Sequence, residues 1–261
     1  MNGNYSKIKF EEHFDGQVYR IILSSPKGNV LDSVMMGEIS NVFSRARENR
    51  HLKIMVFEGE GKHFCFGASV EEHRKERAPA MLEQFHGLFY SMIDLGVPTA
   101  SIVRGQCLGG GMELAIYCDF VFAESTAVFG QPEIKLGVLP PPASIILPLK
   151  AGQRCADRLV LTGESIDAKT ALELGIATFL IPEGKEGWEF VKDWLRDNII
   201  PKSASSLRYA RACERMYFHD AIKKFLPMIQ EMYLKKLMES HDANEGINAF
   251  LEKRPPVFED K

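Results

Sequence analysis

The chain has 261 residues, of which 45% are hydrophobic and 26% charged, and a formal net charge of -3. This length suits one large domain with a sizeable core, and the mildly acidic balance offers no basic surface for nucleic acid, so we expect no nucleic-acid partner. No apolar run of about 18 residues occurs and no apolar signal segment opens the chain, so we expect no membrane partner and a cytoplasmic location.

Cysteine and histidine spacing gives two further expectations. The five cysteines include no Cys-x-x-Cys pair, so a disulfide framework is not expected. The seven histidines show no His-Glu-x-x-His or other metal-ligand spacing. We therefore expect no protein-bound metal.

Strand-like runs alternate with helical patterns in the first two-thirds of the chain. The clearest helical pattern repeats apolar residues from Met35 to Ala46 with the spacing of one buried stripe. This alternation predicts an α/β fold with crossover connections. The expected strands cover residues 18–23, 54–58, 99–103, 120–123 and 177–181.

Helical patterns dominate after Pro182. Residues 220–239 carry apolar side chains on roughly one side, and Pro227 is expected to kink this helix or to start a new one. The last segment predicts a short helix that Pro255 stops. We divide the chain into a core with the active site, residues 1–195, and a helical region that covers the ligand and forms oligomer contacts, residues 196–261.

Three consecutive glycines follow the expected strand at residues 99–103. Gly109 to Gly111 allow the backbone to approach a ligand without an intervening side chain. They also open a helical segment, whose first amides lack partners within the helix and lie at its positive end. Such a place suits an oxygen atom that becomes negatively charged. Taken alone, the pattern also fits a turn capped by Glu113, and the glycine patterns of nucleotide sites are absent.

Two glutamates stand beside residues that restrict the backbone. Glu113 follows the glycines within one helical turn, and Glu133 follows Pro132 in a loop rich in proline and glycine. Burying a carboxylate is unfavourable unless it is hydrogen-bonded or functional. If both glutamates face one pocket, they form an acid–base pair.

A third segment, residues 64–73, follows the expected strand at residues 54–58. Its Gly67-Ala68 turn lies at the carboxyl end of that strand, where ligands of α/β sheets collect. The backbone amides of this turn could provide a second donor to the same oxygen. Without further context, a surface turn is the simpler interpretation.

Together these segments resemble the crotonase family, also called the enoyl-CoA hydratase/isomerase family. The resemblance implies an α/β fold, a crotonase-like spiral of repeated ββα units with a C-terminal helical region. It also implies a homotrimer or homohexamer. The similar segments are collinear and cover residues 25–32, 64–69, 105–119, 129–137, 161–177 and 245–258.

The resemblance also implies roles for individual residues. The two backbone amides of the family's oxyanion hole fall on Ala68 and Gly110, and the two catalytic glutamates of its hydratases fall on Glu113 and Glu133. Because both glutamates are present, we expect a hydro-lyase that adds water to a conjugated acyl-CoA thioester. No metal or redox cofactor is required, and coenzyme A is part of the substrate.

The C-terminal helix of the family contributes an aromatic residue and a lysine toward coenzyme A. These match Phe250 and Lys253. In the family, the two residues often act across a subunit boundary. We therefore expect that the last helix both covers the ligand and takes part in assembly.

The chain departs from the commonest family pattern at two places. Ser69 stands where hydratases of fatty-acid degradation often carry aspartate, and residues 140–144, PPPAS, replace a proline–glycine stretch. With residues 71–73, these departures resemble family members that hydrate a cyclic dienoyl-CoA. The resemblance implies conversion of cyclohexa-1,5-diene-1-carbonyl-CoA to 6-hydroxycyclohex-1-ene-1-carbonyl-CoA in anaerobic aromatic degradation. Ser69, Pro141 and Pro142 are then expected in the substrate pocket.

Two alternatives stay open at this point. One is an ordinary 2-enoyl-CoA hydratase for linear acyl chains, and the other is a non-catalytic binding protein with the same fold. The sequence also leaves open which glutamate is the acid and which is the base. His73 and His86 are interpreted as structural, because an isolated histidine on a helix usually has that role.

Overall fold

The fold is described from a computed structural model that covers residues 5–261. Its strands form a six-stranded sheet in the order β1-β2-β3-β4-β6-β9 and a three-stranded sheet in the order β5-β7-β8. Pairing is parallel except between β1 and β2 and between β7 and β8. The strands are β1 Ile8–His13, β2 Val18–Leu23, β3 Ile54–Gly59, β4 Thr99–Val103, β5 Gln106–Leu108, β6 Phe120–Ala123, β7 Val128–Gly130, β8 Ser165–Asp167 and β9 Phe179–Leu180.

Helices and connecting loops make up the rest of the described chain. The α-helices are α1 Ser33–Glu48, α2 Ala78–Leu95, α3 Gly110–Tyr117, α4 Ala143–Ala151, α5 Gln153–Thr162, α6 Ala168–Glu173, α7 Gly187–Asn198, α8 Ala204–Glu214, α9 Met216–Lys235 and α10 His241–Leu251. The 3-10 helices are η1 Val70–His73, η2 Pro132–Leu136 and η3 Leu237–Glu239. In residues 5–261, no helix combines the length and apolar character needed to cross a membrane.

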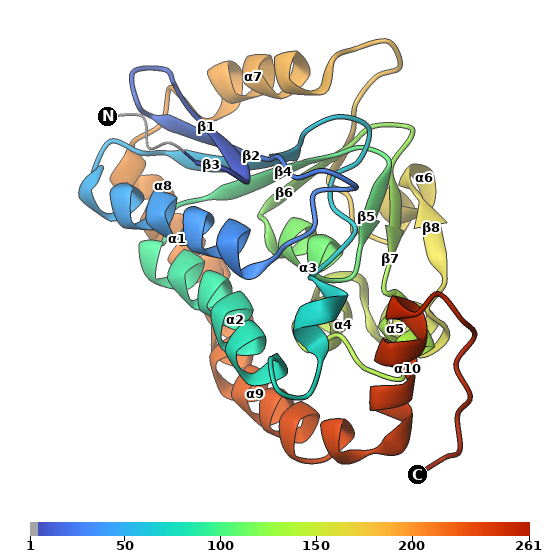
Figure 1. Cartoon of the computed structure of the whole chain (residues 1–261). Coiled ribbons are helices and arrows are strands. Elements are labelled where there is room, and N and C mark those ends of the chain that lie inside the picture. The colour runs from blue at the N-terminus through green and yellow to red at the C-terminus, as the bar shows by residue number, and fades with distance from the viewer. Residues whose placement is uncertain (1–4) are drawn as a thin grey trace.

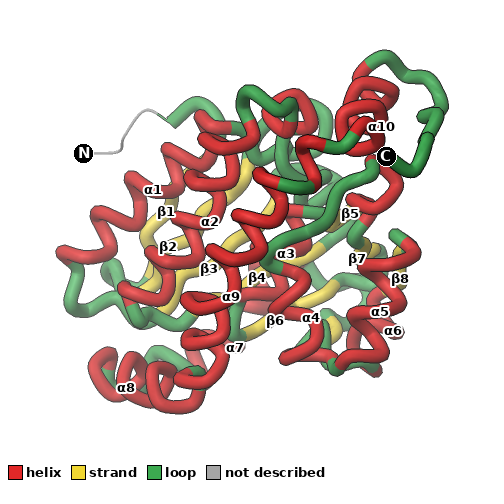
Figure 2. The backbone as a smooth tube through the Cα atoms, turned by 90° about the horizontal axis from the view of Figure 1, so that it is seen from below, coloured by secondary structure: helices red, strands yellow, loops and turns green. Residues whose placement is uncertain are grey.

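The two faces of the large sheet are covered by different helices (Figure 1). On one face, α7 contributes Trp188, Val191 and Leu195 to a smaller core with residues of β2, β3, β4 and β6. On the other face lies the main core, to which α1, α2, α3 and α9 contribute. Figure 2 shows α1, α2 and α9 side by side below the sheet. The chain is therefore a mixed α/β protein with a helical C-terminal part, as expected.

The long strands and the first helix agree with the sequence pattern. The expected strands at residues 18–23, 99–103 and 120–123 coincide with β2, β4 and β6. The apolar stripe of α1 is buried from Met35 to Ala46, and the helix begins where Asp32 Oδ1 accepts a hydrogen bond from the Met35 amide. The expected strand at the end of the core is shorter than predicted, because only Phe179–Leu180 pair.

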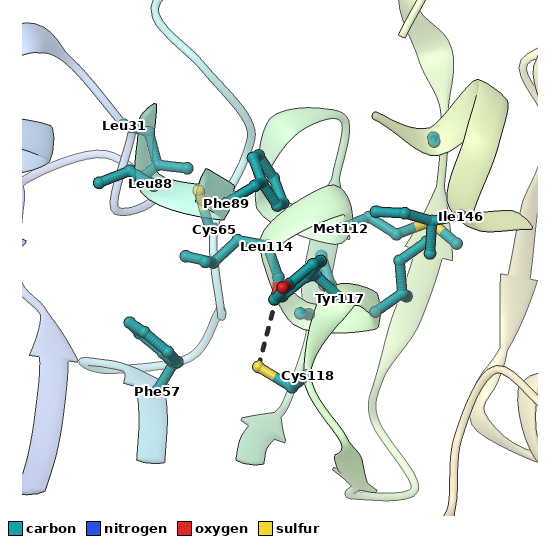
Figure 3. Packing of buried hydrophobic residues seen from close by; sticks show 14 of the residues in the cluster. Leu31, Phe57, Cys65, Leu88, Phe89, Met112, Leu114, Tyr117, Cys118 and Ile146 are labelled. Carbon is teal, nitrogen blue, oxygen red and sulfur yellow. Dashed lines mark hydrogen bonds between the residues drawn. The ribbon is translucent and has the colours of Figure 1, made fainter. Parts of the chain in front are cut away.

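Helix α3 is the innermost helix near the predicted site. Each of its residues is buried. Its Leu114 and Tyr117 pack among side chains such as Phe89 of α2 and Cys65, and Cys118 Sγ donates to the Leu114 carbonyl oxygen (Figure 3). A helix held on all sides in this way fixes the direction of every side chain that leaves it.

The C-terminal helices differ from the sequence prediction in two respects. Helix α9 runs through Pro227, so the expectation of a new helix at this residue is wrong. Its buried Ile222 and Leu226 pack in the main core, and this packing outweighs the one backbone hydrogen bond that proline removes. Phe225 and Met232 of the same helix are 43% and 51% exposed in the single chain.

The last helix ends earlier than predicted. Helix α10 stops at Leu251, before Pro255, and Lys253 takes a left-handed φ of 57° that turns the chain away. The predicted boundary between residues 195 and 196 falls inside α7. The division of the chain into two units stays a prediction.

Candidate active site

Two backbone amides, those of Ala68 and Gly110, lie close together at the start of α3. Leu31 donates to the Gly67 carbonyl oxygen and accepts from the Ser69 amide, both at 3.0 Å, so the amide between them, that of Ala68, faces away. The Gly110 amide belongs to the first turn of α3 and has no partner within the helix. In residues 5–261, neither amide donates a hydrogen bond to the protein. Both are therefore free to bind one ligand oxygen.

The glycines keep this pair of amides accessible. A Cβ atom on Gly110 would lie 3.1 Å from the Ala68 nitrogen and would cover it. Gly109 has a φ of 51° and brings the start of α3 close to the side chain of Glu133, whose Oε1 would be 2.7 Å from a Cβ atom at this position. These two residues therefore need to be glycine for reasons of space and backbone conformation.

Glu113 projects from the first turn of the buried helix α3. Its Oε1 accepts a hydrogen bond of 2.8 Å from the amide of Ala143. Ala143 is the first residue after Pro140, Pro141 and Pro142 that carries an amide hydrogen, and it begins α4. Because the three prolines carry no amide hydrogen, the Ala143 amide is the donor that the N-terminus of α4 directs at this carboxylate.

Glu133 lies on the short helix η2, where the sequence predicted a loop. The neighbouring Gln131 is fully buried, and its amide nitrogen, assigned from the hydrogen-bond pattern, donates to both carboxylate oxygens of Glu133 at 3.1 and 3.0 Å. Both glutamates line the same cavity, together with Ala68 and Gly110. The expected pair therefore shares one pocket with the free amides.

The two carboxyl groups hold protons more tightly than ordinary glutamates. Burial raises the pKa of Glu133 to about 8. Burial, and then the negative charge of Glu133, raise the pKa of Glu113 well above its usual value, although the Ala143 hydrogen bond opposes the shift. Two interacting acids of this kind titrate as a pair, so the pair retains a proton near neutral pH. It can both accept a proton and donate one.

Comparison with known proteins extends this picture to the whole chain. The model of the family described as Enoyl-CoA hydratase/isomerase matches residues 13–261. The chain belongs to this family. It is 40% identical over 98% of both chains to the cyclohexa-1,5-dienecarbonyl-CoA hydratase of Thauera aromatica. It is also 30% identical to a probable mitochondrial enoyl-CoA hydratase of Dictyostelium discoideum, over 94% of this chain and 89% of the relative.

A solved structure agrees on the fold of this crotonase-family hydratase. The enoyl-CoA hydratase from Mycobacterium avium subsp. paratuberculosis K-10 superposes with a TM-score of 0.85, over 98% of this chain and 99% of the other, at 22% sequence identity. The expected crotonase fold and the family are therefore confirmed. The enzyme class is confirmed as well, since the relatives are named hydratases and this chain carries both glutamates.

The other residues predicted for the hydratase site have different positions. Pro141 lines the cavity, whereas Ser69 and Pro142 are not among its lining residues. Ser69 precedes η1 and donates its amide hydrogen to the Leu31 carbonyl oxygen, and Pro142 precedes α4. Phe250 is 54% exposed on α10. Lys253 is exposed at the turn that follows.

Three cavity features of the hydratase were missed from the sequence. His73 lines the cavity, with Nδ1 2.7 Å from the Ser69 carbonyl oxygen, and burial lowers its pKa, so the ring is neutral. Tyr233 reaches the cavity from α9, and Gln131 supports Glu133. His86 lies outside this cavity, against Gln230 of α9. Only His73, the last residue of the segment at residues 64–73, carried a local signal.

Proposed function

We propose that this hydratase adds water to cyclohexa-1,5-diene-1-carbonyl-CoA and forms 6-hydroxycyclohex-1-ene-1-carbonyl-CoA in anaerobic aromatic degradation. The observation that carries the proposal is the full-length similarity to the Thauera aromatica protein of that name. The prolines that line the cavity, Pro140 and Pro141, support it, since Pro141 adds a rigid apolar surface that suits a flat ring.

The free amides of Ala68 and Gly110 supply the first requirement of the reaction. They polarise the thioester carbonyl group, which draws electron density from the conjugated double bonds. Negative charge then develops on the carbonyl oxygen, next to the positive end of α3. Each preorganised donor of this kind contributes about 10²–10³ in rate.

The carboxyl pair supplies the proton transfers. Water gives its hydroxyl group to the carbon β to the carbonyl, and a proton bonds to the far end of the ring diene. One C–O and one C–H bond form, one O–H bond and one π bond are lost, and the remaining double bond moves. No electrons enter or leave, so no redox cofactor is required. Because the amides polarise the carbonyl group and the carboxyl groups transfer the protons, we propose that no metal takes part either. One member of the pair Glu113 and Glu133 accepts a proton from water, and the other donates one.

We also propose a homotrimer or homohexamer in which α10 contacts coenzyme A. Several apolar side chains of α9 are exposed, among them Tyr217 at 76%, Met228 at 59% and Met232 at 51%. A neighbouring subunit would bury them. Lys253 would then provide one positive charge for the phosphates, and Phe250 an apolar surface. The oligomer is tested by sedimentation at micromolar concentration, where a monomer would refute it.

The contact with coenzyme A is tested by point substitution, because deleting residues 245–261 would also disturb η2. Gly246 packs closely on the Leu136 backbone of that helix. We expect Lys253→Ala to raise KM about three- to tenfold with little change in kcat, as for one charge-assisted contact. Lys185→Ala, at an exposed turn beside α7, is the matched control. Unchanged KM in Lys253→Ala would contradict the assignment.

The substrate is tested with the purified enzyme on two thioesters, the cyclic dienoyl-CoA and crotonyl-CoA. We expect higher kcat/KM on the cyclic substrate and the 6-hydroxy product by mass spectrometry and NMR. Activity should survive dialysis against a chelator. Preference for crotonyl-CoA would identify a linear 2-enoyl-CoA hydratase instead. Binding of both thioesters without turnover would identify a non-catalytic binding protein.

A further inference from the structure

The side chain of Tyr233 adds a polar group to the cavity that the glutamates do not explain. Tyr233 comes from α9, lines the cavity and is 1% exposed. In residues 5–261, its hydroxyl group has no hydrogen-bond partner. Leaving a buried hydroxyl without a hydrogen-bond partner is unfavourable. A ligand that brings an acceptor to this position therefore binds more favourably.

The protonation state of Tyr233 decides what it can do. Burial raises the pKa of its phenol, and the charges of Glu133 and Glu113 raise it further. The hydroxyl therefore keeps its hydrogen at neutral pH and is available as a donor. Tyr233 lines the same cavity as Glu113 and Glu133, so this donor lies in the cavity that holds the two acids.

The reaction needs a donor at this place. A water molecule between the two carboxyl groups donates a hydrogen bond to each of them and transfers only one proton. One lone pair of its oxygen attacks the β carbon, and the other lone pair is left to accept a hydrogen bond. The amides of Ala68 and Gly110 are directed at the thioester oxygen. The neutral ring of His73 uses its Nδ1–H on the Ser69 carbonyl oxygen, which leaves an acceptor at Nε2.

We propose that the Tyr233 hydroxyl is a positioning donor for the oxygen atom that is added. In hydration it holds water, and in the reverse dehydration it holds the alcohol oxygen of the hydroxyacyl thioester. This inference rests on the proposed hydration. It explains why a tyrosine with an unpaired hydroxyl occupies a position where phenylalanine would fill the same space.

The test is Tyr233→Phe, which removes the hydroxyl and keeps the ring. We expect kcat to fall about 10- to 100-fold, with KM for the enoyl thioester changed less than about twofold. In dehydration, KM for the hydroxyacyl thioester should rise. Thermal stability should stay equal or increase, since a buried unpaired group is lost. Tyr209→Phe, at a tyrosine 75% exposed on α8, controls for the chemical change.

Two results would overturn the inference. Unchanged kcat in both directions would leave Tyr233 with a packing role only. A raised KM for the enoyl thioester with unchanged kcat would place the hydroxyl on the acyl group and not on the added oxygen. The assay uses whichever thioester the wild type hydrates, so failure of the cyclic substrate is detected separately from failure of the Tyr233 assignment.

Discussion

The two walls of the cavity are built in different ways. The first wall consists of the Gly67-Ala68 turn and the start of α3, and it presents backbone groups held by the buried core. The second wall consists of η2, the proline run before α4, and α9, and it presents side chains such as Glu133, Pro141 and Tyr233. Glu113 connects the two walls, because its side chain projects from α3 and accepts a hydrogen bond from the Ala143 amide.

This difference separates two tasks. If the amides of Ala68 and Gly110 bind the thioester carbonyl as proposed, the first wall selects an activated acyl group. Side chains on the second wall can differ in size and stiffness without changing the fold, so we expect them to select which acyl group fits and where its proton arrives. Substitutions in the first wall should therefore affect all substrates equally, and those in the second should discriminate among them.

The largest expected effect comes from the acids that both walls share. Glu113→Gln and Glu133→Gln should each keep thioester binding and lower kcat by about 10²–10⁴, the range for a positioned acid or base. The glutamine isostere can still accept the Ala143 hydrogen bond at position 113. Stopped-flow turnover and a separate binding measurement check this prediction.

The double substitution sharpens the same prediction. If the carboxyl groups act as one pair, Glu113→Gln combined with Glu133→Gln should lose much less than the product of the single losses. Fully multiplicative losses would mean that each acid works alone. Near-normal turnover of either single variant would remove it from the chemistry.

The next largest effect is expected on the first wall. Gly110→Ala places a methyl group over the Ala68 amide and should lower kcat/KM about 10²-fold on cyclic and linear thioesters alike. Gly87→Ala is the matched control, because a Cβ atom in that helix position meets nothing within 4 Å. A loss confined to one substrate would contradict the separation of the two walls.

The sequence revealed the first wall more completely than the second. The residues Ala68, Gly110 and Glu113 belong to long motifs, and the structure brings all three to one cavity with Glu133. Tyr233 lies far along the chain on an amphipathic helix, where its spacing indicates core packing and nothing more. Only the tertiary arrangement of α9 brings it to the cavity that the glutamates line.

The fold shows the same limit. Strands β2, β4 and β6 were found because runs of buried apolar residues predict them. Strands β5, β7 and β8 have three residues each and were missed, since so short a segment shows no period and is stabilised by its partners. Strand β1, at the edge of the large sheet, was missed because its IKFEEH sequence is largely polar.

A smaller and selective effect is expected from the proline wall. Pro141→Gly combined with Pro142→Gly loosens the loop and should reduce kcat/KM on the cyclic dienoyl-CoA about tenfold more than on crotonyl-CoA, a difference of about 1.4 kcal/mol. Pro182→Gly, at an exposed position shortly after β9, is the control for loss of a proline. Equal losses on both thioesters would limit the prolines to folding or general positioning.

The smallest effect is on stability, and its sign follows from the raised pKa of Glu133. An unfolded glutamate ionises near pH 4.5, whereas folded Glu133 keeps its proton to about pH 8. Between these values the folded state binds more protons, so wild-type stability falls as pH rises through this window. Glu133→Gln cannot ionise and avoids this loss. Its melting temperature should match wild type near pH 4.5 and exceed it at pH 8, by about 2–4 °C for each kcal/mol.

The measurement is a series of melting curves from pH 4.5 to 9, with exposed Glu183→Gln as the control for loss of a carboxylate. A difference that grows with pH and levels off above about pH 8 would follow the titration of Glu133. If the same substitution also lowers activity, the buried acid Glu133 reduces the stability of the free enzyme and supplies a proton for the reaction at neutral pH. A constant difference across the series would mean that Glu133 has an ordinary pKa in the folded state, and the proton at neutral pH would then have to come from Glu113.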